Sequence, residues 1–245
     1  MKVPAEWIVP DWPAPASVKA LVTTRLGGVS RGPYASLNLG SRTGDDSNAV
    51  RENRARLERV LPQAPRWLDQ QHGNMVVEAD ALEAPVAADA SIARHTDTVC
   101  AILVADCVPV LLADRAATCV AAAHAGWRGL ASGVLENTLE GMAVAPEDVL
   151  AYLGPGIGRD AFEVGSDVRD AFVMRDAGAQ DAFRPLREGK WLADLFQLAR
   201  RALTRAGVAA VYGGGQCTVS DPGRFYSYRR DRTTGRMAAL IWRAR

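Results

Sequence analysis

Apolar residues alternate and cluster along the chain in a pattern that predicts strands and helices in mixed order. Segment 18–25 is β-branched and predicts a strand that runs into a glycine-rich loop. Segments 48–61 and 192–206 each carry apolar residues near one face, which predicts two amphipathic helices, the second ended by Gly207. Further helices are expected over 129–142 and 166–177, and further strands over 98–113, 118–125, 148–153, 208–212 and 238–242. This mixture predicts an α/β (α+β) fold rather than a strict doubly wound sheet.

The turn DRAA joins the two most apolar of these strands and predicts an antiparallel hairpin. If Ala113 pairs with Thr118 and the ladder has no bulge, Cys107 lies directly opposite His124. Side chains directly opposite each other share a face, with Cβ atoms about 4.5–5.5 Å apart. A thiolate and an imidazole at that separation can bind one metal ion.

His72, in the polar turn DQQHGN, is the candidate for a third ligand. Three protein ligands with an open fourth position are typical of a catalytic zinc site, although two histidines and one cysteine also resemble a blue-copper site. The alternative is that Cys107 is a buried thiol and that His72 and His124 are hydrogen-bonded. The remaining histidine, His95, lies in the polar segment IARHTDT and is interpreted as a surface residue.

Asp106 interrupts an otherwise apolar strand and is the candidate for a further catalytic residue. A carboxylate does not stay buried without partners, so it is either hydrogen-bonded structurally or positioned for function. In a regular strand Asp106 faces away from Cys107, which favours a supporting role unless the strand ends there.

Several arginines are candidates for binding an anionic substrate through charge-assisted hydrogen bonds. Arg25 stands at the entrance of the loop with Gly27 and Gly28, Arg128 lies beside HAGW, and Arg229 belongs to an arginine pair. The loop is neither GxxxxGK[ST] nor GxGxxG, so it is a weak nucleotide signal. For each arginine, a surface salt bridge is the alternative.

Composition limits the class of protein. The 245 residues carry a net charge of +1, so neither a nucleic acid nor a membrane is expected as a partner. The N-terminal MKVPAEWIVPDWPAP lacks the apolar run of a signal peptide, so a cytoplasmic location is expected. The four cysteines form no CxxC pair and are expected to be thiols. No linker or repeat divides the chain, which predicts a single domain over residues 1–245.

Short motifs follow one another along almost the whole chain. In order they are TTRLGGVSRGPYASLNLG, GDD with NR downstream, QQHG, ADCVPVLLAD, HAGWRG, GPGIG with FEVG, and FYSYRRD with TGR. Together, from residue 23 to residue 236, they resemble the YfiH-like "laccase-domain" proteins. The resemblance carries the metal ligands onto His72, Cys107 and His124, the residues that the spacing also indicates.

The resemblance implies a single-domain, four-layer α/β/β/α sandwich with mixed sheets. It also implies a zinc-dependent purine nucleoside phosphorylase that acts on adenosine, inosine, guanosine and methylthioadenosine, with inorganic phosphate as co-substrate. Hydrolytic deamination of adenosine is implied as a second activity. Arg25 is the preferred candidate for the phosphate site, with Arg128 and Arg229 behind it. A small-molecule nucleoside is the expected partner, and the sequence does not indicate whether a partner protein exists.

Three alternatives are open: a copper oxidase, a cysteine hydrolase, and a non-enzymatic metal-binding or interaction module that acts in cell-wall quality control. The family's older label is polyphenol oxidase, which implies copper, but three histidines cannot furnish a multicopper cluster. A lone copper at the site remains compatible with slow oxidation. The second alternative is a cysteine hydrolase with Cys107 as nucleophile and His124 as base. It would suit the link between some bacterial members and the editing of peptidoglycan precursors.

Overall fold

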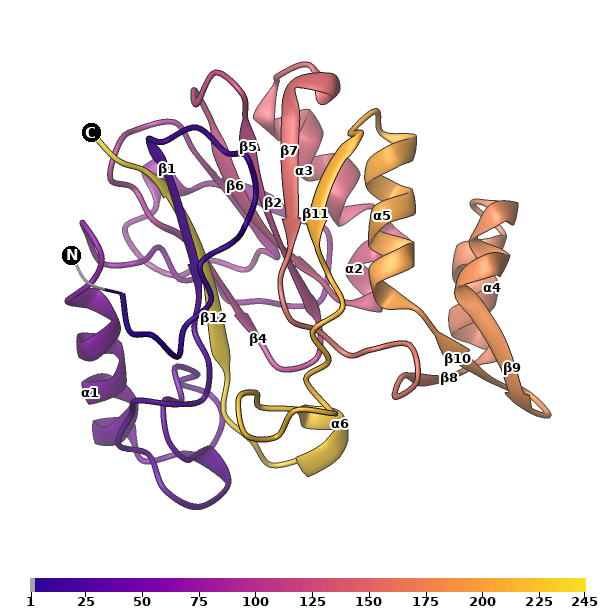
Figure 1. Ribbon diagram of the computed structural model, residues 1–245, viewed down its shortest axis with the longest axis horizontal. Coiled ribbons are helices and arrows are strands. Elements are labelled where there is room, and N and C mark those ends of the chain that lie inside the picture. The colour runs from indigo at the N-terminus through magenta and orange to yellow at the C-terminus, as the bar shows by residue number, and fades with distance from the viewer. Residues whose placement is uncertain (1–2) are drawn as a thin grey trace.

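Two β-sheets lie face to face between two layers of helices in the computed structural model, which describes residues 3–245 (Figure 1). The small sheet has the antiparallel order β1 (Val18–Val22), β12 (Met237–Arg243), β4 (Cys100–Val104). The large sheet has the order β11 (Ala210–Gly213), β7 (Val149–Leu153), β5 (Val108–Asp114), β6 (Val120–Ala125), β3 (Ala90–Ala93), β2 (Val76–Glu78). Its outer pairs, β11 with β7 and β2 with β3, are parallel, so the sheet is mixed.

The outer layers are helical. Helix α1 (Ser47–Glu58) covers the small sheet, and α2 (Trp127–Ser132), α3 (Val134–Met142) and α5 (Leu195–Arg205) cover the large one (Figure 1). A third sheet, β8 (Glu163–Gly165), β10 (Lys190–Ala193) and β9 (Phe183–Arg187), extends to one side with α4 (Ser166–Val173) (Figure 1). The short helix α6 (Tyr228–Asp231) precedes β12. The layers confirm the expected α/β/β/α sandwich.

Alternation along the strands explains why both sheets are covered on both faces. In β12, Ala238 and Leu240 pack toward α1, whereas Ala239 and Ile241 pack against the large sheet. Because successive side chains of a strand point to opposite faces, one apolar run contributes to two packed layers. The space between the sheets is therefore a dry apolar layer, and functional side chains are found at its end.

The expected strand over 98–113 is wrong, because the chain changes sheets within it. Strand β4 belongs to the small sheet and β5 to the large one, and residues 105–107 connect them. Asp106 has φ +91°, and its carbonyl accepts a hydrogen bond from the backbone N–H of Ile157 at 2.7 Å. The sharp bend at Asp106 places Cys107 at the joint between the two sheets.

The predicted hairpin exists, but its register is displaced by two residues. Ala113 pairs with Val120, and His124 lies opposite Pro109. The physical reason is the Asp114 carboxylate, which accepts hydrogen bonds from the backbone N–H groups of Thr118 at 2.8 Å and Cys119 at 2.7 Å and so closes a longer loop. Because side chains alternate between the two faces of a strand, a register shift of two residues leaves Cys107 and His124 on the same face. Cys107 is therefore diagonal to His124 instead of directly opposite.

Glycine and aspartate change two helix boundaries. The predicted helix 129–142 is broken into α2 and α3 at Gly133, which has φ +95°. The predicted helix 192–206 begins only at Leu195, because the Asp194 side chain caps it and β10 precedes it. In the part of the chain that the structure describes, every helix is too short or too polar to cross a bilayer.

Candidate metal centre and substrate cleft

His72, Cys107 and His124 come together where the inter-sheet layer ends. One ligand atom from each lies within 4.8 Å of the other two, and the two imidazole rings meet edge to face with centroids 4.8 Å apart. His124 is buried near the end of β6, Cys107 is half-buried before β5, and His72 is exposed in its turn. The donor set, two nitrogens and one sulfur, is one that zinc prefers.

Asp89 organises this cluster, and the sequence reasoning did not identify it. The carboxylate is buried and accepts hydrogen bonds from the backbone N–H groups of Gln71, His72 and Gly73 at 3.1, 2.9 and 2.7 Å. Its Oδ1 also lies 2.8 Å from Nδ1 of His124. One carboxylate therefore holds the turn that carries His72, which has φ +60°, and orients the His124 ring. An acid ahead of the small apolar run ASIA was the available signal.

The three side chains of the cluster perturb one another electrostatically. Burial by itself raises the pKa of the Cys107 thiol, but the charges and hydrogen bonds of His124 and His72 lower that pKa to about 6. Burial by itself lowers the pKa of His124, but Cys107 and Asp89 raise it to about 9. Without a metal ion the pair is a thiolate beside an imidazolium, and the thiolate is the form that binds metals.

Asp106 lies beside the cluster and is fully engaged by the protein. Its Oδ1 accepts a hydrogen bond from the Thr218 hydroxyl at 2.6 Å, and its Oδ2 accepts one from the backbone N–H of Arg229 at 2.6 Å. The strand ends at Val104, before this residue, so alternation does not turn Asp106 away from the cleft, which it helps to line. The carboxylate ties the start of α6 to the joint that carries Cys107.

A cleft of about 650 Å³ opens over the cluster. The cluster residues, Asp106 and six arginines line it: Arg42, Arg54, Arg128, Arg229, Arg232 and Arg236. Arg42 pairs with Asp69, whereas within residues 3–245 the other five have no carboxylate in salt-bridge distance. Two of the predicted anion-binding residues, Arg128 and Arg229, are therefore in the cleft.

Arg25 is placed elsewhere. Its Nε donates to the Ala35 carbonyl at 2.8 Å, its Nη1 donates to the Pro222 carbonyl at 3.0 Å, and the guanidinium stacks on Tyr226. These contacts fix the glycine-rich loop to the segment before α6. The structure does not bring Arg25 together with the cluster.

Aromatic rings line the same cleft and stack with its arginines. The guanidinium carbon Cζ lies over a ring in each pair: Arg54 over Trp67 at 4.5 Å from the ring centroid, Arg128 over Trp127 at 4.4 Å, and Arg229 over Phe162 at 5.3 Å. Flat apolar rings and planar cations next to each other suit a flat, polar heterocycle. Apart from Arg128 and Arg229, sequence reasoning named none of these residues, because they come from segments distant in the chain.

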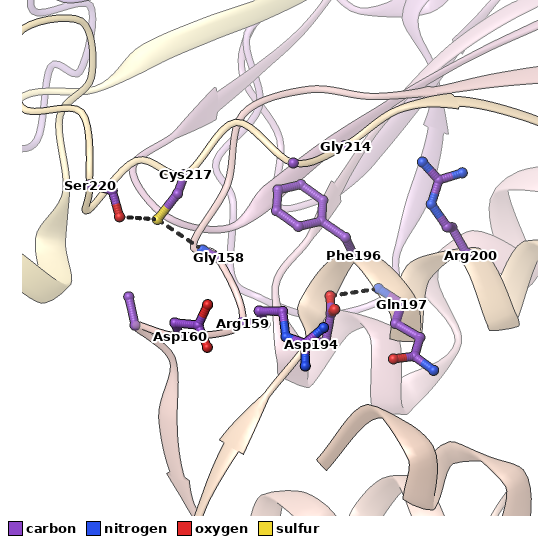
Figure 2. A pocket seen from close by; sticks show the side chains of 12 residues that line it. Gly158, Arg159, Asp160, Asp194, Phe196, Gln197, Arg200, Gly214, Cys217 and Ser220 are labelled. Atoms are coloured by element: carbon purple, nitrogen blue, oxygen red, sulfur yellow. Dashed lines mark hydrogen bonds between the residues drawn. The ribbon is translucent and has the colours of Figure 1, made fainter. Parts of the chain in front are cut away.

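A second cavity, of about 510 Å³, contains another perturbed thiol (Figure 2). Cys217 accepts hydrogen bonds from the Gly158 backbone N–H at 3.2 Å and the Ser220 hydroxyl at 3.3 Å. Burial raises its pKa, but the hydrogen bonds from Ser220 and Gly158 outweigh burial and lower it. In contrast, burial raises the pKa of Cys100 to about 12 and that of Cys119 to about 11. The four free thiols thus divide into two with a lowered pKa, Cys107 and Cys217, and two with a raised pKa, Cys100 and Cys119.

The fold and the site define a class of protein: an α/β/β/α sandwich with a two-histidine, one-cysteine cluster in an arginine-rich cleft. Residues 19–244 match the family described as "Multi-copper polyphenol oxidoreductase laccase". The chain belongs to this family, as its motifs indicated.

Relatives and solved structures agree with this assignment. A Pseudomonas aeruginosa protein named purine nucleoside phosphorylase is 55% identical over 237 residues, 96% of this chain and 98% of that protein. An Escherichia coli K12 protein of the same name is 53% identical over 239 residues, again 96% and 98%. The crystal structure of NMB0706 from Neisseria meningitidis superposes with a TM-score of 0.95 at 53% identity, covering 98% of this chain and 100% of that one. YlmD from Geobacillus stearothermophilus gives 0.87 at 32% identity, covering 100% and 98%.

Proposed function

We propose that this protein is a zinc-dependent purine nucleoside phosphorylase. The observation that carries the proposal is the joint presence, in one cleft, of the His72–Cys107–His124 cluster and of five arginines that have no carboxylate partner among the described residues. Phosphorolysis needs a bound phosphate and a bound purine nucleoside at the same time. The names of the relatives at 55% and 53% identity support the same reaction.

The residues fit a zinc ion. Three ligand atoms within 4.8 Å of one another, a thiol with a lowered pKa and a histidine whose Nδ1 is held by Asp89 match the donor set and the supporting contacts of a catalytic zinc site. When bound, zinc would supply Lewis acidity at an open coordination position. Copper is the alternative metal for the same ligands.

The other side chains of the cleft account for the remaining requirements. In the reaction a phosphate oxygen bonds to C1′ of the ribose while the bond from C1′ to the purine nitrogen breaks, and the purine leaves with a proton. Trp127 and Phe162 offer faces on which the purine stacks, and arginines neutralise the phosphate. Asp106, next to Cys107 in the chain, accepts hydrogen bonds from the Thr218 hydroxyl and the Arg229 backbone N–H and so holds the start of α6 beside the cluster.

We include hydrolytic deamination of adenosine and phosphorolysis of inosine, guanosine and methylthioadenosine in the proposal. These purine nucleosides share a flat base and an uncharged ribose, so one cleft serves them all. Deamination uses water in place of phosphate, so the two activities are separable by omitting phosphate.

The test is to incubate the zinc-loaded protein with adenosine or inosine, with and without phosphate, and to separate the products by chromatography. We expect adenine and hypoxanthine only with phosphate, and inosine from adenosine in either case. The Cys107→Ala variant is expected to lose both activities together with its zinc. Absence of all these products from zinc-replete protein would refute the proposal.

One observation favours a second candidate, a cysteine hydrolase acting on amide bonds such as those of peptidoglycan precursors. The Cys107 thiol has a pKa lowered to about 6 beside His124, which is the arrangement of an activated nucleophile and its base. A metal-bound thiolate is a poor nucleophile, so the two candidates respond oppositely to zinc. A hydrolase gains activity when a chelator removes the metal, whereas the phosphorylase loses it.

A further inference from the structure

Arg54 and Arg236 differ from the other arginines of the cleft in how they are held. Both are half-buried, whereas Arg128 and Arg232 are exposed and remain hydrated. Burial lowers the pKa of both guanidinium groups. Neither has a carboxylate in salt-bridge distance within residues 3–245. The exposed Glu58, one turn beyond Arg54 on α1, raises the pKa of Arg54 by its charge, but burial outweighs this effect. A partly desolvated cation without a counterion is costly unless a ligand provides the counterion.

The two arginines reach the cleft from opposite ends of the chain and meet at one short segment. Arg54 Nε donates to the Leu39 carbonyl at 3.0 Å, and the Leu39 backbone N–H donates to the Arg236 carbonyl at 3.1 Å. The buried Asn38 side chain accepts a hydrogen bond from the Arg236 backbone N–H at 2.8 Å. Segment 38–40 therefore fixes both arginines on one edge of the cleft.

Each side chain is also fixed along its length. Arg54 stacks on Trp67, and Arg236 donates through Nη1 to the carbonyls of Thr234 and Gly235 at 3.1 and 2.9 Å. Arg236 packs so closely on Gly40 that a Cβ at position 40 would lie 2.8 Å from its Cγ. Because the two guanidinium groups are already held in place, they lose little conformational entropy when an anion binds. This is expected of a binding site for a planar or tetrahedral oxyanion.

The neighbouring arginine on this edge is already neutralised. Arg42 pairs with Asp69, so it contributes a charge that is balanced within the protein.

The other arginines near the cluster have different surroundings. Arg229 stacks on Phe162 and donates a hydrogen bond to the Glu163 carbonyl at 2.8 Å. Arg236 lines the same cleft as the cluster and Asp106, and the negative charges of Cys107 and Asp106 raise its pKa against the effect of burial. An anion held by Arg54 and Arg236 would lie beside the cluster.

We propose that Arg54 and Arg236 form the subsite for a phosphate-type oxyanion, and that its occupant is inorganic phosphate. This inference rests on the proposed function for the identity of the reaction, but the binding itself does not depend on it. The same oxyanion chemistry is present in the 5′-phosphate of a nucleotide, so the experiment includes both sources.

The first experiment measures initial rates of inosine phosphorolysis against phosphate concentration for the zinc-loaded wild type and the Arg54→Gln, Arg236→Gln and Arg236→Lys variants. Loss of a charge-assisted contact should raise the KM for phosphate on the order of 10- to 100-fold and leave the KM for inosine unchanged. Lysine keeps the positive charge but lacks the planar set of donors with which a guanidinium binds two oxygens. The KM for phosphate of Arg236→Lys should therefore lie between those of the wild type and the glutamine variant. Arg51→Gln, on the exposed face of the same helix, is the matched control.

The second experiment titrates inorganic phosphate and, separately, AMP into the same zinc-loaded proteins by isothermal titration calorimetry. Phosphate binding that Arg54→Gln and Arg236→Gln weaken supports the subsite, even if no phosphorolysis is found and the proposed function fails. Active enzyme whose KM for phosphate is unchanged in both variants overturns the subsite and leaves the function standing. Binding of AMP through these arginines, with no binding of inorganic phosphate, overturns the assignment of the occupant.

Discussion

Oδ1 of Asp89 lies 2.8 Å from Nδ1 of His124, which leaves Nε2 as the ring nitrogen available to a metal ion. The same carboxylate receives the backbone N–H groups of the turn that carries the other histidine of the cluster, His72. Two ligands from distant segments are thus positioned by one buried acid. The metal affinity of the cluster should depend on a residue that touches no metal.

Replacing Asp89 by Asn should lower zinc affinity by about 10- to 100-fold, because the carboxylate that orients His124 and raises its basicity is lost. A competition titration with a chromophoric zinc chelator measures the affinity. Asp170→Asn, an exposed change on α4, serves as the control. Equal affinity in Asp89→Asn and the wild type would show that Asp89 only supports the turn.

Zinc should protect one of the two thiols with a lowered pKa from alkylation. In metal-free protein, iodoacetamide is expected to label Cys107 and Cys217, whose pKa values are lowered, and to spare Cys100 and Cys119. Adding zinc should abolish labelling of Cys107 alone, because Cys217 lies in the second cavity. Peptide mass spectrometry identifies the labelled positions. Unchanged labelling of Cys107 with excess zinc would contradict its role as a ligand.

The stability of the protein should fall in acid partly through Asp80. Burial raises the pKa of this carboxyl, but hydrogen bonds from the backbone of Arg94, the Thr98 hydroxyl and the backbone of His95 outweigh burial and hold it below the usual value. A group whose pKa is depressed by folding stabilises the protein above its unfolded pKa of about 3.9, and the contribution is lost as the pH falls through the folded pKa.

The variant Asp80→Asn should therefore be less stable than the wild type by roughly 1–3 kcal/mol at pH 6, and the difference should shrink below about pH 4. Urea unfolding of the metal-free proteins at a series of pH values measures this difference without contributions from metal binding. A difference that stays constant down to pH 3 would mean that the charge of Asp80 is not involved.

Gly40→Ala tests whether segment 38–40 positions Arg236. The added Cβ would lie 2.8 Å from Arg236 Cγ and from Thr43 Cγ2, so the arginine stem has to move although no charge is removed. We expect weaker phosphate binding, with zinc affinity unchanged. Ala161→Gly serves as the control. Gly189→Ala would not serve, because the φ of +65° at Gly189 would strain an alanine. Calorimetry with inorganic phosphate measures the affinity. Wild-type affinity in Gly40→Ala would show that the position of Arg236 does not depend on the close contact with Gly40.

Local patterns in the sequence indicated a mixed α/β fold and a candidate cluster of His72, Cys107 and His124, whereas the four layers were implied only by the family resemblance. Alternation and helical periodicity identified most elements, and the face shared by Cys107 and His124 was right although their register was not. The register failed because the Asp114 side chain, and not the backbone alone, closes the hairpin loop. Arg54 and Arg236 stand in the motifs NR and TGR, but they were not singled out as anion-binding residues because only the folded chain brings them to the same backbone segment. Asp89 was missed for the same reason, since its partners are 16 to 35 positions away.

The joint at residues 105–107 links ligand occupancy to the packing of the whole sandwich. Cys107 lies between β4 of the small sheet and β5 of the large one, so a metal ion that Cys107 helped to hold would be anchored at the connection between the two sheets. Binding at two coupled places is reciprocal: whatever metal occupancy adds to the cohesion of the sheets, their cohesion adds to metal affinity. Ile102→Val removes one methyl group from the layer between the sheets without touching a ligand. It should thus raise the dissociation constant of the metal ion.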